Sequence, residues 1–80
     1  MNKKHHDILR HMTGLDRSKT SFRNYFAANP DGDDFKDLEE MMSLGWVMRG
    51  CTSLESNLVY FHATEAGMTA ARLPFEHYAA

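Results

Sequence analysis

Three histidines near the start of the chain are the first residues whose side chains suit metal binding. His5, His6 and His11 all precede the first glycine. Metal ligands on one helix need a spacing that puts them on the same face, and they need a further ligand nearby. His11 lies six and five positions after His5 and His6, which places neither pair on one face. Asp7 and His11 have the right spacing, but two ligands do not complete a site. The spacing therefore favours surface histidines and predicts no metal.

Cys51 and His62 are the next candidates for chemistry. A cysteine nucleophile needs a nearby base and an electropositive setting. His62 falls on the strand opposite Cys51 in a predicted hairpin, but Glu55 adds negative charge to the loop between them. We expect His62 to be a strand residue with a satisfied imidazole. The chain has no glycine-rich phosphate loop and no Ser-His-Asp order. We therefore predict that it is not an enzyme and that it needs no cofactor.

Charge is distributed unevenly along the sequence. Residues 1–23 contain six basic residues and two acids, whereas residues 24–80 contain three basic residues and nine acids. Six of those acids fall between Asp31 and Glu40. Such asymmetry predicts a bipolar surface and a charged partner for at least one pole. The basic residues of the first stretch are Lys3, Lys4, Arg10, Arg17, Lys19 and Arg23.

The elements that position these residues follow from apolar spacing and end signals. Residues 3–13 read as an amphipathic helix that stops at Gly14. A second helix is expected to begin at Thr20 or Ser21. Its buried face is expected to comprise Phe22, Tyr25 and Phe26.

A third helix is expected after the turn Asn29-Pro30-Asp31-Gly32, with Asp33 or Asp34 as its cap. Its apolar face is predicted to comprise Phe35, Leu38, Met41 and Met42. Its outward face is predicted to comprise Asp33, Lys36, Asp37 and Glu40.

A hairpin and a last helix are expected beyond Gly45. Residues 46–49 and 58–63 read as two strands, with Trp46 anchoring the hairpin on the core. Thr64 caps a helix that carries Met68, Ala71 and Leu73 and ends at Pro74. Residues 74–80, with Phe75, His77 and Tyr78, are expected to form a tail.

The stretch Leu38-Glu39-Glu40-Met41-Met42-Ser43-Leu44-Gly45-Trp46-Val47-Met48-Arg49, followed by Thr64-Glu65-Ala66-Gly67, resembles the second half of a winged-helix domain. This resemblance covers about residues 35–73 and implies an α+β fold with three helices, a two-stranded hairpin (the wing) and a short C-terminal helix. We expect one such domain over residues 1–80. The general character of the chain is also similar to small proteins of phages and prophages.

The resemblance implies DNA binding through the third helix and the wing. Such contacts need basic or amide side chains at bases and positive charge at phosphates. The third helix is acidic instead, and the predicted wing loop has no Lys or Arg. An acidic face loses the affinity that phosphate neutralisation supplies.

We therefore expect a non-enzymatic binding module, encoded by a phage or mobile element. It would bind or inhibit a host protein that has a basic surface, such as nucleic-acid-handling or CRISPR machinery. The residues expected to bind this protein are Asp31, Asp33, Asp34, Asp37 and Glu40.

Two alternatives remain open at this point. One is a winged-helix DNA-binding regulator that uses Lys3, Lys4, Arg10, Arg17, Lys19 and Arg23, or that dimerises to build a positive surface. The other is a metal-dependent enzyme, which a metal analysis of the purified protein tests. No apolar run approaches the roughly 20 residues of a membrane span, so we expect no membrane contact. The single Cys51 cannot form an internal disulfide, and we therefore expect a cytoplasmic protein.

Overall fold

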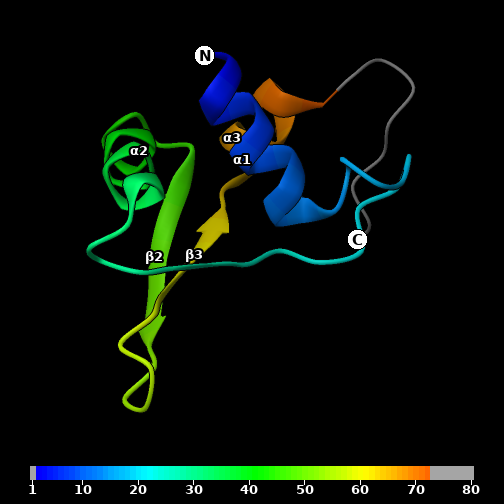
Figure 1. Cartoon of the computed structure of the whole chain (residues 1–80). Helices are drawn as coiled ribbons and strands as arrows, with labels where there is room; N and C mark the ends of the chain where they lie inside the picture. The colour runs from blue at the N-terminus through cyan, green and yellow to red at the C-terminus, as the bar shows by residue number, and fades with distance from the viewer. Residues whose placement is uncertain (1, 73–80) are drawn as a thin grey trace.

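Three helices and a three-stranded antiparallel sheet make up residues 2–72, the part of the chain that the computed structural model describes (Figure 1). The predicted α+β class is confirmed, but the sheet has a third strand that the sequence analysis did not predict. The order of strands across the sheet is β1-β3-β2. The elements are α1 (Lys3–Thr13), β1 (Phe26–Ala28), α2 (Asp33–Ser43), β2 (Val47–Thr52), β3 (Val59–Ala63) and α3 (Glu65–Ala71).

Helix α1 has the predicted bounds. The side chain of Asn2 accepts a hydrogen bond from the His5 backbone N–H and caps the start of the helix. Gly14 ends the helix in the left-handed conformation with φ 88°, which glycine adopts without steric cost. The buried stripe includes Leu9 and Met12, both fully enclosed.

No helix forms between α1 and α2 in the described chain, and this corrects the predicted second helix. Neither Thr20 nor Ser21 caps one, because β1 is the next regular element. Phe22 and Tyr25, expected on a buried helix face, are exposed, and only Phe26 packs against the core. The aromatic spacing was therefore misread as helical.

Pairing with the second edge of β3 explains why the chain between α1 and α2 is extended and not helical. The side-chain amide of Asn24 donates to the Ala63 carbonyl (3.2 Å), and its oxygen accepts from the Ala63 N–H (2.7 Å). Strand β1 then pairs with β3, with Phe26 opposite Phe61 and Ala28 opposite Val59. A free edge would leave these backbone groups unpaired, so strand pairing outweighs the local helical pattern.

Strand β3 lies in the middle of the sheet and faces the helices. Its Val59, Phe61 and Ala63 are buried, in the alternation of a strand with one face on the core. Strand β2 pairs along its other edge, with an irregularity between Arg49 and Thr52 where β2 contributes one more residue than β3. The far end of the hairpin extends away from the helices (Figure 1).

Helix α2 begins at Asp33, and its cap residue precedes both of the predicted cap residues. The cap residue is Gly32, which makes no side-chain bond, so neither Asp33 nor Asp34 is the cap. Both lie inside the first turn, where negative charge suits the helix dipole. The helix ends at Ser43, and the Gly45 N–H donates to the Met42 carbonyl.

Helix α3 is capped as predicted. The hydroxyl of Thr64 accepts from the Gly67 N–H at 3.1 Å and donates to the Gly45 carbonyl at 2.6 Å. Gly67 also allows a close approach, since a Cβ there would lie 2.1 Å from the Trp46 carbonyl oxygen. The predicted Leu73 contact, the stop at Pro74 and the tail lie outside the described residues.

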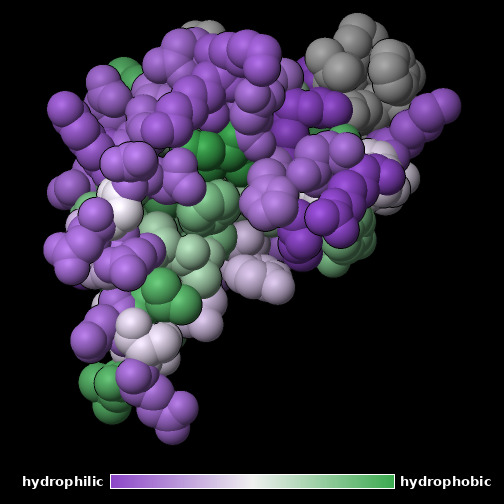
Figure 2. All heavy atoms as spheres, viewed as in Figure 1, coloured by the Kyte–Doolittle hydropathy of each residue, from purple (hydrophilic) through white to green (hydrophobic). Residues whose placement is uncertain are grey.

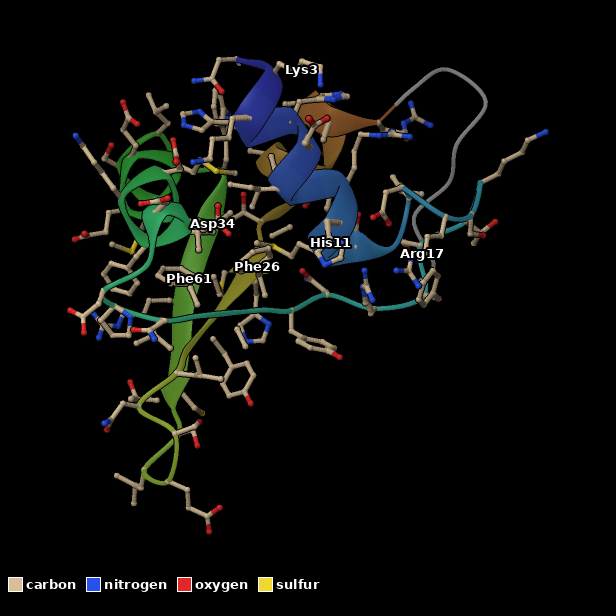
Figure 3. All side chains as sticks on the ribbon, viewed as in Figure 1. Lys3, His11, Arg17, Phe26, Asp34 and Phe61 are labelled. Carbon is tan, nitrogen blue, oxygen red and sulfur yellow. The ribbon has the colours of Figure 1, made fainter. Side chains whose placement is uncertain are left out.

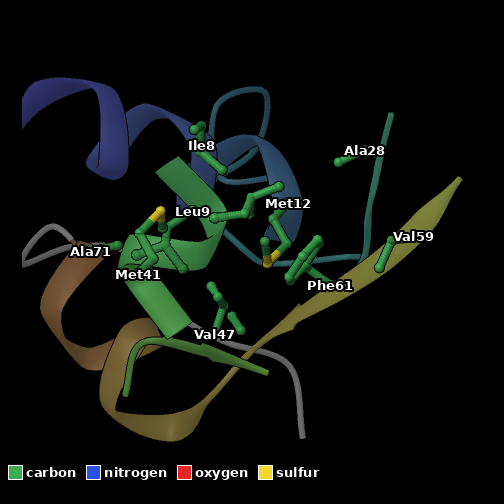
Figure 4. Packing of buried hydrophobic residues seen from close by; sticks show 11 residues of the cluster. Ile8, Leu9, Met12, Ala28, Met41, Val47, Val59, Phe61 and Ala71 are labelled. Atoms are coloured by element: carbon green, nitrogen blue, oxygen red, sulfur yellow. The ribbon is translucent and has the colours of Figure 1, made fainter. Parts of the chain in front are cut away.

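One hydrophobic core joins all three helices to the sheet (Figure 4). Leu38 and Met41 of α2 are fully buried in it, as predicted, whereas Phe35 packs at its margin and Met42 is exposed. Trp46 is half-buried against the same core. None of the helices in residues 2–72 is long and apolar enough to cross a membrane.

Candidate functional site

The acidic helix α2 meets the start of α1 through Lys4. The ammonium of Lys4 lies 2.6 Å from Asp37 Oδ2 and 3.8 Å from Asp34 Oδ1. Asp37 was predicted to point outward, but its side chain is only 19% exposed because it turns toward α1. The hydrogen bond from Lys4 holds the pKa of the Asp37 carboxyl below its ordinary value, and the same bond raises the pKa of Lys4.

His5 lies beside this ion pair, on the α1 side facing α2. Its Nε2 is 3.3 Å from Asp37 Oδ1 and 3.5 Å from Glu40 Oε2. The imidazole is 4% exposed, and Nε2 has no hydrogen-bond partner of good geometry. The edge of the ring meets Trp46 at 6.1 Å between centroids. A buried polar atom therefore points at two carboxylates without a proper hydrogen bond to either.

His5, Asp37 and Glu40 are the group within residues 2–72 that could hold a metal ion. Their potential ligand atoms all lie within 4.8 Å of one another. The sequence analysis compared histidines only along α1 and so missed this group, because its members come from two helices. The available signals were the i, i+3 spacing of Asp37 and Glu40 and the place of His5 near the apolar stripe.

Three further acids were predicted to bind a protein, and they are more accessible to solvent than Asp37 is. Asp31 and Asp33 are exposed, and Asp34 is half-buried. Apolar side chains are exposed where α2 passes into β2, namely Met42, Leu44 and Met48. In the view of Figure 2, hydrophilic residues cover the helices, and apolar residues lie at the centre and at the lower tip.

The basic residues predicted for nucleic acid differ in their surroundings. Lys3 pairs with Asp7 at 3.2 Å, and the guanidinium of Arg10 donates to the Leu15 carbonyl at 3.0 Å. Lys3 and Arg17 lie at opposite ends of the path from α1 into the following turn (Figure 3). Lys4 is engaged with α2, and Arg17 and Lys19 are exposed.

Arg23 belongs to a small polar cluster around His11 of α1. Its Nη2 and Nε both donate to the His11 carbonyl, at 2.6 Å and 2.9 Å. The guanidinium of Arg23 also lies over the Phe22 ring. His11 Nδ1 in turn lies 2.9 Å from Asp16 Oδ2. Arg23 is therefore bound within the fold.

The two residues considered for nucleophilic chemistry do not come together as a base and a thiol. Cys51 is a free, exposed thiol. His62 is half-buried, and its Nδ1 lies 2.7 Å from the Asn24 carbonyl. Residues 2–72 enclose no pocket beside either side chain.

No protein-family model, curated protein or solved structure matches the chain.

Proposed function

We propose that this chain is a non-enzymatic binding domain that docks onto a basic protein surface through the outer face of α2. The supporting observation is the set of exposed residues on that face. Three of them are acidic and one is basic. The outer face comprises Asp33, Lys36, Glu39, Glu40 and Ser43.

Apolar side chains next to the outer face favour a protein as the partner. Met42, Leu44 and Met48 are exposed beside it in sequence, at the end of α2 and the start of β2. Methionine adapts its shape to a partner, and exposed apolar groups rimmed by charge mark interaction surfaces. A partner with Arg or Lys around an apolar spot complements this arrangement.

A partner that normally handles nucleic acid has the required charge, because its own groove must neutralise phosphates. A domain with an acidic helix can occupy such a groove and inhibit the protein. An inhibitor of this kind, carried by a phage or mobile element against host nucleic-acid-handling machinery, is the specific form of the proposal.

Direct DNA binding through α2 would press like charges together. Carboxylates of the outer face would meet phosphates, at a cost of several kcal/mol for mismatched charge. Use of the basic residues instead involves four side chains that already have contacts within the fold. Lys3 and Lys4 contact Asp7 and Asp37, and Arg10 and Arg23 donate to backbone carbonyls.

Two measurements test the proposal. The first is fluorescence anisotropy of a mixed-sequence DNA duplex with the full chain, at low and at physiological salt. We expect no binding even at low salt. Binding that weakens steeply as salt rises would instead support the DNA-binding alternative, because counterion release has that signature.

The second measurement uses charge-reversed variants against nucleic-acid-handling proteins of the host. The double variant Asp33→Lys/Glu39→Lys should lose binding by tenfold or more, because reversal juxtaposes like charges. Glu55→Lys, in the exposed loop of the hairpin, is the matched control and should bind as the original chain does. Equal loss in both variants would argue against the outer face of α2.

A further inference from the structure

The buried imidazole of His5 needs a partner that the fold does not supply. Its Nε2 is enclosed and makes no hydrogen bond of good geometry, although two carboxylates are aimed at it. A buried polar atom without a hydrogen-bond partner destabilises the fold, so such atoms usually have a role. The unpartnered atom lies between α1 and α2.

The distances around Nε2 match those between ligands of one metal ion. Tetrahedral bonds of about 2.0–2.1 Å place neighbouring ligand atoms roughly 3.3–3.4 Å apart. Nε2 lies 3.3 Å from Asp37 Oδ1 and 3.5 Å from Glu40 Oε2. An optimal N–H···O bond is shorter, at about 2.9–3.0 Å.

We infer that His5, Asp37 and Glu40 bind a divalent transition-metal ion, zinc by preference, which joins α1 to α2. One imidazole nitrogen and two carboxylate oxygens are ligands that zinc accepts. The two carboxylates match the two charges of the ion. This inference does not depend on the proposed function.

Lys4 does not compete for the same oxygen. Its ammonium is on Asp37 Oδ2, whereas the oxygen that faces His5 is Oδ1. The carboxylate of Asp34 also lies 3.8 Å from the Lys4 ammonium and offsets its charge. Lys4 thus orients the Asp37 carboxylate, as outer-shell groups do at metal sites.

The position of Glu40 keeps the site open to solvent. Its side chain is 61% exposed, while His5 is buried. Three protein ligands leave a fourth tetrahedral position on the exposed side, which a water molecule can fill. Ions can therefore enter without unfolding of the domain.

The test is titration of the full, EDTA-treated chain with zinc chloride by calorimetry, and with cobalt chloride by visible absorption. We expect one zinc ion per chain with a dissociation constant in the micromolar range or below. Cobalt should give the visible bands of tetrahedral coordination. At a hundredfold excess of free zinc over the dissociation constant, Tm should rise on the order of 10 °C.

Variants distinguish this site from adventitious binding by surface histidines. Glu40→Gln and His5→Gln should each weaken zinc binding by more than tenfold. Losing a direct ligand lowers metal affinity more than losing an outer-shell group, which by itself costs about tenfold or more. If His5→Gln fails to fold, the exposed Glu40→Gln carries the test. Glu39→Gln and His6→Gln are the matched controls on the same two helices.

Two results would overturn the inference. One is the absence of zinc binding by the folded chain when zinc is present at about a hundredfold excess over micromolar. The other is binding that survives Glu40→Gln unchanged or that disappears in His6→Gln. Either would leave His5 as a buried side chain beside two carboxylates, without a metal.

Discussion

Asp16 shows how single side chains in this protein are held by contacts that the sequence does not suggest. It lies in the turn after α1, with Oδ2 2.9 Å from His11 Nδ1 and Oδ1 3.9 Å from the Arg23 guanidinium. Partial burial pushes the pKa of the Asp16 carboxyl up. The hydrogen bond to His11 and the charges of His11, Arg23 and Arg17 outweigh burial, so the pKa lies below its ordinary value of 3.8.

This lowered pKa predicts how stability depends on pH. The folded state favours ionised Asp16, so its contribution is complete above the ordinary pKa and is lost as the pH falls through the lower, folded pKa. Asp16→Asn should therefore lower the free energy of unfolding at pH 6 by about 0.5–1 kcal/mol. The difference between the two proteins should close near pH 2.

Urea unfolding at both pH values measures this difference. Asp7→Asn is the control, because Asp7 pairs only with the highly exposed Lys3 and should change stability less. A gap that persists at pH 2 would show that the lost contribution is not the charge of Asp16.

At the scale of elements, the sequence predicted correctly those helices whose ends and buried faces depend on neighbouring residues. The α1 bounds, the Gly14 stop and the Thr64 cap were read correctly, because caps and amphipathic stripes depend on neighbours in sequence. The second helix was wrong because Phe22, Tyr25 and Phe26 have a spacing that suits a helix, while β3 required a partner strand. Pairing with a distant strand has no local signal.

The candidate site had the same difficulty. Asp37 and Glu40 were recognised as one face of a helix, but that face was assigned to solvent. The contact of Asp37 with Lys4 and His5 depends on how α1 packs on α2, which the sequence does not encode locally. Long-range packing thus decided both the missing helix and the orientation of Asp37.

Gly67 offers a test in which two element-scale effects have opposite signs. In a helix interior, glycine is about 1 kcal/mol less favourable than alanine, so helix propensity predicts that Gly67→Ala stabilises. Its Cβ, however, would lie 2.1 Å from the Trp46 carbonyl oxygen, and backbone cannot yield as a flexible side chain can. We expect packing to win, with a loss of about 1–3 kcal/mol.

Thermal or urea unfolding followed by circular dichroism measures the effect of Gly67→Ala. The control is Thr69→Ala, an exposed position on the same helix that should change stability by less than about 0.5 kcal/mol. Stabilisation by Gly67→Ala would mean that α3 can move away from the Trp46 backbone, and that the close approach seen here is not required.

At the scale of the whole molecule, β3 connects the parts. It pairs with β1 on one edge and β2 on the other, and α1 and α3 both contact it. The molecule extends 37 Å along its longest axis but only 18 Å along its shortest, so the core is thin and the central strand must carry much of it. The basic and acidic stretches of the sequence also come into contact at this scale, because Lys4 of the first pairs with Asp37 of the second.

A thin core predicts a sharp contrast between two apolar truncations. Phe61 is fully buried on β3 and meets the Phe35 ring edge-on at 5.6 Å, whereas Leu54 in the hairpin loop is 96% exposed. Phe→Ala in a core costs about 3–5 kcal/mol, against a total stability of roughly 4–12 kcal/mol for a chain of this length. Phe61→Ala should therefore lose most or all of the folded state, and Leu54→Ala should change stability by less than about 0.5 kcal/mol.

Urea unfolding monitored by Trp46 fluorescence compares the two variants, with Phe61→Leu as a variant that keeps most of the buried volume. Phe61→Leu should remain folded and lie between the original chain and Phe61→Ala, because smaller cavities cost less. If Phe61→Ala were as stable as Leu54→Ala, the far part of the sheet would not share the core. The helices would then form the stable unit, and β1 would add little. The expected order of stability, with Phe61→Leu between the original chain and Phe61→Ala, would instead indicate that the sheet and the helices unfold together. Trp46 fluorescence detects this because Trp46 packs at the junction between them.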